Sequence, residues 1–278
     1  MHASQWYPGY IEKYREAELA RELLRAALRK LEELLDNDVV IVGAGPAGLT
    51  LSWLLASKGL RVTVVEQTLG LGGGMRGGAA LLPAGLVEEG EAANLLREAG
   101  VELRETRLRG IYAIDPVEAA TKLAARAISA GARFLVGIYV EDLIIRGHGA
   151  RRQVDGVVVN LRPVVEAGWH VDPWFIEARA TVDATGHDAW LVKLLEKRVP
   201  GSVKPKGMSS LDVWRGERLV VEKTGEVFPG LYLAGMSVAE THNLPRVGPV
   251  FGGMIASAIR LAEILEKRLM DREAEIHG

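Results

Sequence analysis

An apolar strand, a glycine-rich turn, a helix and a second strand that ends in an acid follow one another between residues 38 and 66. In the turn, Gly43 permits a sharp change of direction, Gly45 lets the backbone approach a pyrophosphate, and Gly48 lets helix and strand pack closely. The helix N-terminus favours an anion, and Glu66 is placed to accept hydrogen bonds from a ribose diol. A glycine turn alone is weak evidence, but the flanking elements supply the context that the motif requires. The sequence therefore predicts an adenine-dinucleotide site.

Length and charge limit the classes of protein to which the chain can belong. Its 278 residues, 48% of them hydrophobic, suit one large α/β domain or a main domain with an inserted lobe. Because 34 basic and 36 acidic residues nearly cancel, we expect a small-molecule ligand and neither nucleic acid nor a membrane as partner. The charged N-terminal region does not resemble a secretion signal, so a cytoplasmic location is expected. Cysteine is absent, which excludes any mechanism that needs a protein thiol.

The remaining pattern predicts a flavoprotein-like (glutathione-reductase-type) dinucleotide-binding Rossmann fold with an additional β-rich lobe. We expect a helical arm over residues 1–36, because apolar positions recur at helical spacing from residue 10, and a single α/β domain over residues 37–278. Inserted strands around 132–180 would form the lobe. The same reasoning predicts a helix at 116–130, a buried strand at 132–140, a turn into a strand at 154–160, short strands at 180–186 and 230–236, and a final helix at 253–272.

Histidine and aspartate side chains form one group of candidate ligands. His170 and Asp172 lie in one short run, and His187 follows a strand and a glycine turn. Imidazole and carboxylate together suit Fe(II), Zn(II) or Mn(II), and incomplete protein ligation leaves positions for a substrate. Spacing alone leaves open the alternative that these are ordinary polar loops.

A second group of candidates surrounds Arg246, which lies between two prolines in the run LPRVGP. A guanidinium fixed in this way can bind a small carboxylate through two hydrogen bonds, or it can bond to loop carbonyls. No spacing assigns a proton-transfer role to Glu240, Asp188 or His242. The loop at 70–78 is too rich in glycine for regular structure of its own, and we expect it to lie along the dinucleotide.

Taken together, these motifs resemble the thiamine thiazole synthase family in its archaeal branch. The resemblance rests on GAGPAG, on Glu66 with the GLGGG loop, on HVDP and TGHD, and on GMSVAETHNLPRVGPVFGGM, and it covers about residues 20–265. That family has a flavoprotein-like fold but uses NAD as a substrate. The resemblance implies that nicotinamide is removed, that the ADP-ribose carbons are joined to glycine, and that sulfur is installed to give an adenylated thiazole carboxylate. One departure is Val247, where the family usually has methionine.

Site residues follow from the resemblance position by position. It implies that Arg246 binds the carboxylate of glycine and that Asp172 and His187 are ligands of Fe(II). In the family these two ligands come from different subunits of a homo-oligomer, commonly an octamer. The implied dinucleotide site comprises Gly43, Gly45, Ala47, Gly48, Glu66, Gln67, Gly74, Val140, His170, Asp172 and Met236. The catalytic residues that it implies are His170, Asp172, His187 and Arg246.

His170 decides which sulfur chemistry is possible. In fungal and plant members of the family the matching position is a cysteine that gives up its sulfur to the product. Imidazole has no sulfur, and this chain has no cysteine to substitute, so we expect a multi-turnover enzyme that uses free sulfide. The role of His170 itself, in positioning substrate or in moving protons, stays open.

Other functions remain compatible with the motifs. The strand order and glycine turns are equally typical of an FAD-dependent oxidoreductase. A sugar-phosphate isomerase and a non-catalytic nucleotide-binding module are further alternatives.

Overall fold

The computed structural model describes residues 13–277, with side chains described as far as residue 270. Its contacts divide the chain into two compact units, Met1–Asp36 and Asn37–Gly278. In the first unit, α1 (Glu16–Glu32) carries acids in its first turn and basic residues in its last, which matches the helix dipole. None of the residues of α1 is buried. The part of the predicted arm before residue 13 lies outside the described residues.

The described elements are as follows. The strands are β1 (Asp36–Val42), β2 (Val62–Glu66), β3 (Gly85–Glu88), β4 (Arg104–Glu105), β5 (Ile111–Ile114), β6 (Arg133–Val136), β7 (Ile138–Arg146), β8 (Gln153–Leu161), β9 (Trp174–Asp183), β10 (Ser209–Leu211), β11 (Gly225–Phe228), β12 (Leu231–Leu233) and β13 (Pro245–Arg246). The further α-helices are α2 (Pro46–Ser57), α3 (Glu91–Ala99), α4 (Pro116–Ser129), α5 (Arg162–Glu166), α6 (Trp190–Arg198), α7 (Val213–Lys223), α8 (Met236–His242) and α9 (Gly252–His277). Short 3-10 turns are η3 (Gly73–Gly77), η4 (Gly149–Arg151) and η5 (Gly186–Asp188).

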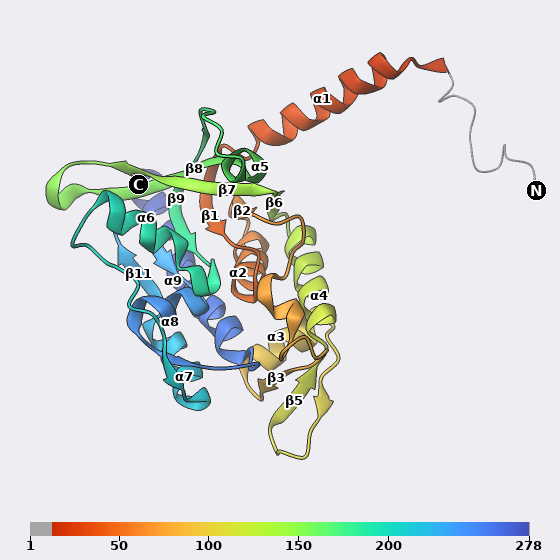
Figure 1. Cartoon of the computed structure of the whole chain (residues 1–278), viewed down its shortest axis with the longest axis vertical. Coiled ribbons are helices and arrows are strands. Elements are labelled where there is room, and N and C mark those ends of the chain that lie inside the picture. Colours follow the sequence, from red (N-terminus) through yellow and green to blue (C-terminus); the bar gives the residue numbers. More distant parts are fainter. Residues whose placement is uncertain (1–12, 278) are drawn as a thin grey trace, which may run out of the picture. The chain divides into compact units, whose positions relative to one another are not determined.

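An eight-stranded sheet forms the centre of the second unit. Its order is β11-β12-β9-β1-β2-β6, and the hairpin of β7 and β8 joins it through β9 (Figure 1). Parallel pairing joins β1 to β2, β2 to β6 and β12 to β9, whereas β7, β8 and β9 pair antiparallel. The helix α2 crosses from β1 to β2, as parallel neighbours require. Two smaller sheets pair β3-β5-β4 and β10-β13.

Successive side chains of β1 point into two different cores. Val39 and Ile41 belong to a cluster with residues of α2, α4 and α9, whereas Val40 and Val42 belong to a cluster with residues of β7, β8, β9 and α6. This alternation follows from the two-residue period of a strand. Because β1 is covered on both faces, its residues 39–42 form a continuous apolar run rather than an alternating one.

The carboxyl ends of several strands meet at one edge of this sheet. The chain leaves β1 for β2 on one side, while β9 and β12 lie on the other side of β1. Ala184 N donates to Val42 O over 2.9 Å, and Ala234 N donates to Asp183 O over 3.2 Å, so the ends of β1, β9 and β12 lie together. Open α/β sheets bind ligands outside such a switch point.

Most predicted elements are present, but some boundaries differ. The helix predicted at 116–130 is α4, and the final helix is longer than predicted. The single strand predicted at 132–140 is wrong, because Gly137 has a φ of +72° and separates β6, which pairs with β2, from β7, which pairs with β8. The loop at 70–78 includes the turn η3, and 154–160 is continuous strand. Within the described part of the chain, no helix is both long and apolar enough to cross a membrane.

Candidate active site

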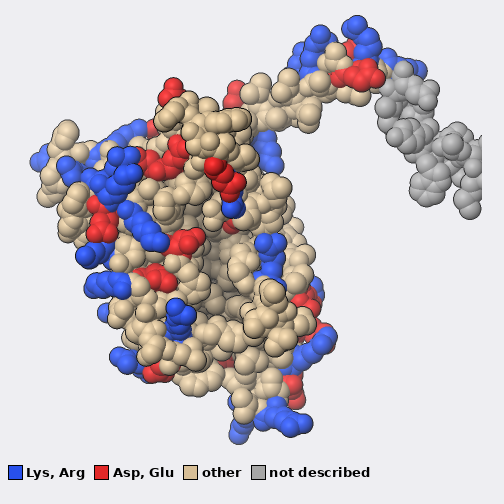
Figure 2. Space-filling model, viewed as in Figure 1, with Lys and Arg blue, Asp and Glu red and all other residues tan. Residues whose placement is uncertain are grey.

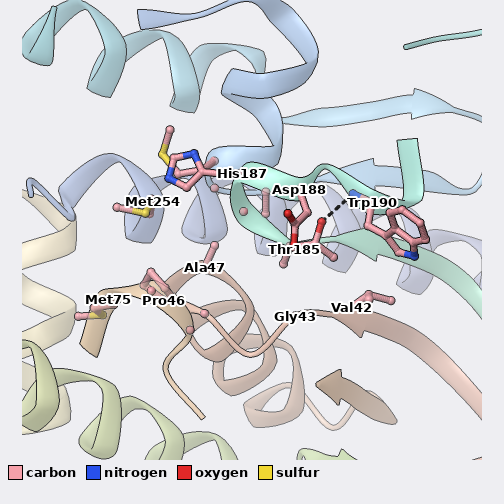
Figure 3. Close-up of a pocket in the computed structure, with 18 of the residues that line it drawn as sticks. Val42, Gly43, Pro46, Ala47, Met75, Thr185, His187, Asp188, Trp190 and Met254 are labelled. Atoms are coloured by element: carbon pink, nitrogen blue, oxygen red, sulfur yellow. Dashed lines mark hydrogen bonds between the residues drawn. The ribbon is translucent and has the colours of Figure 1, made fainter. Parts of the chain in front are cut away.

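A large cavity opens at the carboxyl ends of β1, β2, β9 and β12, with a volume of about 1240 Å³. The space-filling view shows the surface hollowed there, with basic and acidic side chains nearby (Figure 2). In the close-up, the turn with Gly43, Pro46 and Ala47 forms one wall, and the turn with His187 and Asp188 lies across from it (Figure 3). The predicted site residues that line the cavity are Gly43, Gly45, Ala47, Glu66, Gln67, Gly74, Val140, His187, Met236 and Arg246. Gly48, His170 and Asp172 do not line it.

The three glycines of the GAGPAG motif have different structural surroundings. Gly43 has a φ of +103°, and a Cβ atom there would lie 2.4 Å from Ala184 O. A Cβ atom on Gly48 would lie 2.0 Å from Gly43 O, so Gly48 is required by packing between helix and turn. Gly45 is the N-cap of α2 and has no atom within 4 Å of an added Cβ. Gly45 is therefore the position at which a ligand could approach the helix N-terminus.

The second glycine loop lies against the first. Gly72 N donates to Ala44 O over 2.8 Å, and a Cβ atom on Gly73 would lie 3.0 Å from the Cα atom of Gly45. Gly74 has open space where a side chain would begin. The loop thus borders the place where the predicted pyrophosphate would lie. Glycine at 72 and 73 lets the backbone of this loop pack closely on the backbone of the first turn.

Glu66, at the end of β2, is buried and holds the turn that precedes α2. Its Oε2 atom accepts from Ala44 N over 2.9 Å, and Oε1 accepts from Thr68 N and Thr68 Oγ1, both over 2.8 Å. A carboxylate has about four acceptor positions, so these three bonds leave room for one ribose hydroxyl. Glu66 therefore has a structural role, and its bond to a ribose stays a prediction.

Asp183 shapes the turn that carries His187. It is fully buried and accepts from Thr185 N over 3.0 Å, from Thr185 Oγ1 over 2.7 Å, and from the backbone N atoms of Leu191 and Val192 over 2.8 and 3.2 Å. Burial raises the pKa of Asp183, while these hydrogen bonds oppose the rise by stabilising the carboxylate. Asp183 thus joins the end of β9 to the start of α6 and fixes η5 between them. Asp183 was not among the predicted site residues, although its place at the end of an apolar strand, before a small-residue turn, is visible in the sequence.

An aromatic pair lies beside Val140, which belongs to the predicted dinucleotide site. The Nε1 atom of Trp190 donates to Val140 O over 2.7 Å, and the rings of Tyr139 and Trp190 lie 5.5 Å apart at 54°. Burial, followed by the nearby carboxylates of Asp188 and Glu141, raises the pKa of Tyr139. Neither aromatic residue was predicted from the sequence, because each reaches the cavity only through the pairing of β7 and the placement of α6.

Arg246 presents an exposed side chain from a fixed backbone. It lies on β13, which pairs with β10, and Arg246 O accepts from Asp212 N over 3.3 Å. The guanidinium makes no ion pair with any residue that the structure describes. Arg76 and Lys193 also line the cavity. Three cations and two carboxylates, Glu66 and Asp188, give the wall a composition that suits an anionic ligand.

The predicted metal ligands are not brought together within one chain. His187 is exposed on the cavity wall, whereas His170 and Asp172 are exposed in the segment between α5 and β9. Asn160, which is buried, anchors that segment through a bond of 3.1 Å from Nδ2 to Val171 O. Among the described residues, no three His, Cys, Asp or Glu side chains lie close enough to hold a metal ion.

Comparisons with known proteins agree with one another. A model of the Thi4 family matches residues 20–251. A thiamine thiazole synthase of Pyrobaculum aerophilum is 44% identical over 264 residues, which cover 95% of this chain and 98% of the relative. Another, of Archaeoglobus fulgidus, is 43% identical over 254 residues, with 91% and 96% coverage. The crystal structure of Thermovibrio ammonificans THI4 superimposes with a TM-score of 0.88 at 38% identity and covers 92% of this chain and 98% of that one. The predicted flavoprotein-like Rossmann fold is confirmed.

Proposed function

The chain belongs to the Thi4 family, and on this basis we propose that it acts in thiamine biosynthesis as a thiazole synthase that consumes NAD, glycine and free sulfide. The expected product is an adenylated thiazole carboxylate. The resemblance predicted from the motifs is confirmed at the level of the family. The substrates, the metal and the assembly are the proposal, and the following observations support them.

A dinucleotide as substrate is supported by the cavity itself. The N-terminus of α2, the open position at Gly45 and the adjacent loop at Gly74 together form a lined space for a pyrophosphate. Glu66 has acceptor capacity for a ribose hydroxyl at the end of β2. The cavity extends from there to Arg246, so a dinucleotide and a small amino acid could be held in one space.

Glycine as the second substrate is supported by Arg246. Its guanidinium is exposed to the cavity and makes no ion pair with a described residue, while its backbone is fixed by the pairing of β13 with β10. A planar guanidinium can bind a carboxylate through two parallel hydrogen bonds and thereby orient the amino group of glycine.

The residues present fit an Fe(II) ion whose ligands come from two subunits. His187 supplies an exposed imidazole on the cavity wall, and Asp172 supplies a carboxylate on an exposed segment that does not line the cavity of its own chain. An imidazole and a carboxylate suit Fe(II) and leave other positions open, at which the bound ion would hold sulfide and act as a Lewis acid. His187 and Asp172 would hold the ion, and Arg246 would hold the amino acid beside it.

A homo-oligomer is supported by the surface around Asp172. Trp169, Val171 and Phe175 are 68%, 50% and 59% exposed, which is unusual for three large apolar side chains so close in sequence. We expect this segment to pack on a second copy of the chain, with an octamer as the complete assembly. Such packing would bring Asp172 to the cavity of the neighbouring subunit.

The absence of cysteine is the single observation that carries the sulfur chemistry. None of the 278 residues is a cysteine, so no protein sulfur can be transferred to the product by way of a thiol. The enzyme is therefore expected to turn over repeatedly with an external sulfide.

Mass spectrometry of the small molecule released from the purified protein tests the proposal. An adenylated thiazole, or NAD-derived ADP-ribose joined to glycine, is the expected finding. Release of FAD, accompanied by the visible absorption of a flavin, would instead identify an oxidoreductase and refute the assignment.

A further inference from the structure

Glu240 lies beside the predicted metal ligand His187. The Nδ1 atom of His187 and the Oε1 atom of Glu240 are 3.6 Å apart, and the side chains are 65% and 15% exposed. We propose that Glu240 is a positioning residue, whose carboxylate holds the proton of His187 on Nδ1 and so presents the unprotonated Nε2 atom to the metal. This inference rests on the proposed function, because the metal is part of it.

Both side chains are carried by elements that are fixed to the end of β9. The turn η5, with His187, is held by Asp183. The helix α8, with Glu240, is held to the same residue, because Ser237 Oγ donates to Asp183 O over 2.6 Å. Glu240 O also accepts from Lys206 N over 2.9 Å. The backbone positions of both residues are therefore set by the fold.

The burial of the pair is asymmetric in a way that suits this role. Glu240 is mostly enclosed, and His187 is the ionisable side chain found within ion-pair distance of it among the described residues. The distance of 3.6 Å is longer than a hydrogen bond, but the exposed imidazole can turn toward the enclosed carboxylate when it binds a ligand. Ligand histidines commonly donate their second ring N–H to a carboxylate, which fixes the tautomer and raises the basicity of the ligating nitrogen.

Fe(II) affinity, measured anaerobically by competition with a chromophoric chelator, tests the proposal on the full-length oligomer. E240A should weaken Fe(II) binding by about 10-fold, the lower end of the effect of such partners, because His187 is partly in water. E240Q keeps a hydrogen-bond acceptor without the negative charge, so it should lose less Fe(II) affinity than E240A. E196Q removes one negative charge from the half-buried Glu196 on α6, which does not line the cavity, and should bind Fe(II) like the parent protein.

Two further readouts separate positioning from a general structural effect. NAD affinity should be the same in E240A as in the parent protein, because Glu240 does not line the cavity. Nitrogen NMR at alkaline pH, where imidazole is neutral, should show the Nδ1–H tautomer of His187 in the parent protein and a shift toward Nε2–H in E240A.

The contrary outcomes are distinct. The inference would be overturned if E240A had the Fe(II) affinity and the His187 tautomer of the parent protein. It would also be overturned if E240A lost NAD binding and stability together with Fe(II) affinity. If the parent protein itself bound no Fe(II), the metal of the proposed function would be wrong, and the tautomer measurement would still decide whether Glu240 orients His187.

Discussion

Replacing Gly45 by alanine should weaken dinucleotide binding without unfolding the protein. Gly45 has φ −76° and ψ −175°, which alanine adopts readily, and an added Cβ would meet no atom within 4 Å. We therefore expect the free energy of unfolding of G45A to lie within about 1 kcal/mol of the parent value. The same methyl group would occupy the space that a pyrophosphate needs next to the helix N-terminus, so NAD affinity should fall at least about 10-fold.

The matched variant G48A should, unlike G45A, have a clearly lower free energy of unfolding. A Cβ atom on Gly48 would lie 2.0 Å from Gly43 O, and contacts under 3.0 Å require a shift, so α2 and the turn must move apart by about 1 Å. Overpacking of this kind costs about 1–3 kcal/mol or more, and here the added Cβ atom would clash with a backbone atom and not with a flexible side chain. The assay is urea denaturation of both variants, followed by calorimetric titration with NAD. If G45A bound NAD as tightly as the parent protein while remaining folded, the turn would not be the pyrophosphate site.

Three other predictions address pH, substrate and assembly. Glu217 is buried, its Oε1 atom has no hydrogen-bond partner, and burial raises its pKa from 4.5 to about 7. Between these two pH values the folded state keeps a proton that the unfolded state has lost, so the free energy of unfolding should fall by about 3 kcal/mol from pH 4.5 to 7. Urea denaturation should show that E217Q removes this fall. An unchanged pH dependence in E217Q would contradict the reasoning. R246A should raise the KM for glycine in steady-state assays while leaving NAD affinity intact, with R246K intermediate because it cannot form two parallel bonds; equal effects on both substrates would argue against a glycine clamp. The D172A and H187A proteins should each be inactive. If the two ligands come from different subunits, an equal mixture that is unfolded and reassembled should regain activity at about a quarter of the sites, those that combine an intact Asp172 with an intact His187. No recovery would place both ligands in one chain.

The parts of the site that depend on local sequence could be predicted. Gly43 and Gly45 line the cavity, Gly48 packs α2 against them, and the acid that ends the next strand follows at the expected distance, so this wall was identifiable from spacing. Arg246 was a candidate from its position between two prolines, and family resemblance added its glycine role and Met236; the structure places both residues in the same cavity. Whether each of these residues binds its predicted ligand stays a prediction.

The parts that depend on distant contacts could not be predicted. Trp190 reaches Val140 only because α6 packs on β7, and Glu240 meets His187 only because α8 and η5 are both fixed to the end of β9. The boundary between β6 and β7 was missed because a strand that changes partners at a glycine has the same apolar pattern as one long strand. Asp172 lies outside the cavity of its own chain, and no property of a single sequence shows where a second copy packs.

Carbon labelling of NAD shows whether the protein consumes the dinucleotide. NAD labelled in the ribose next to nicotinamide would be incubated anaerobically with the protein, glycine, Fe(II) and sulfide, and the products would be analysed by mass spectrometry. We expect label in an adenylated thiazole and, because the chain has no cysteine to give up, several equivalents of product per subunit. Recovery of intact labelled NAD, or a yield that stops at one equivalent per subunit, would contradict it.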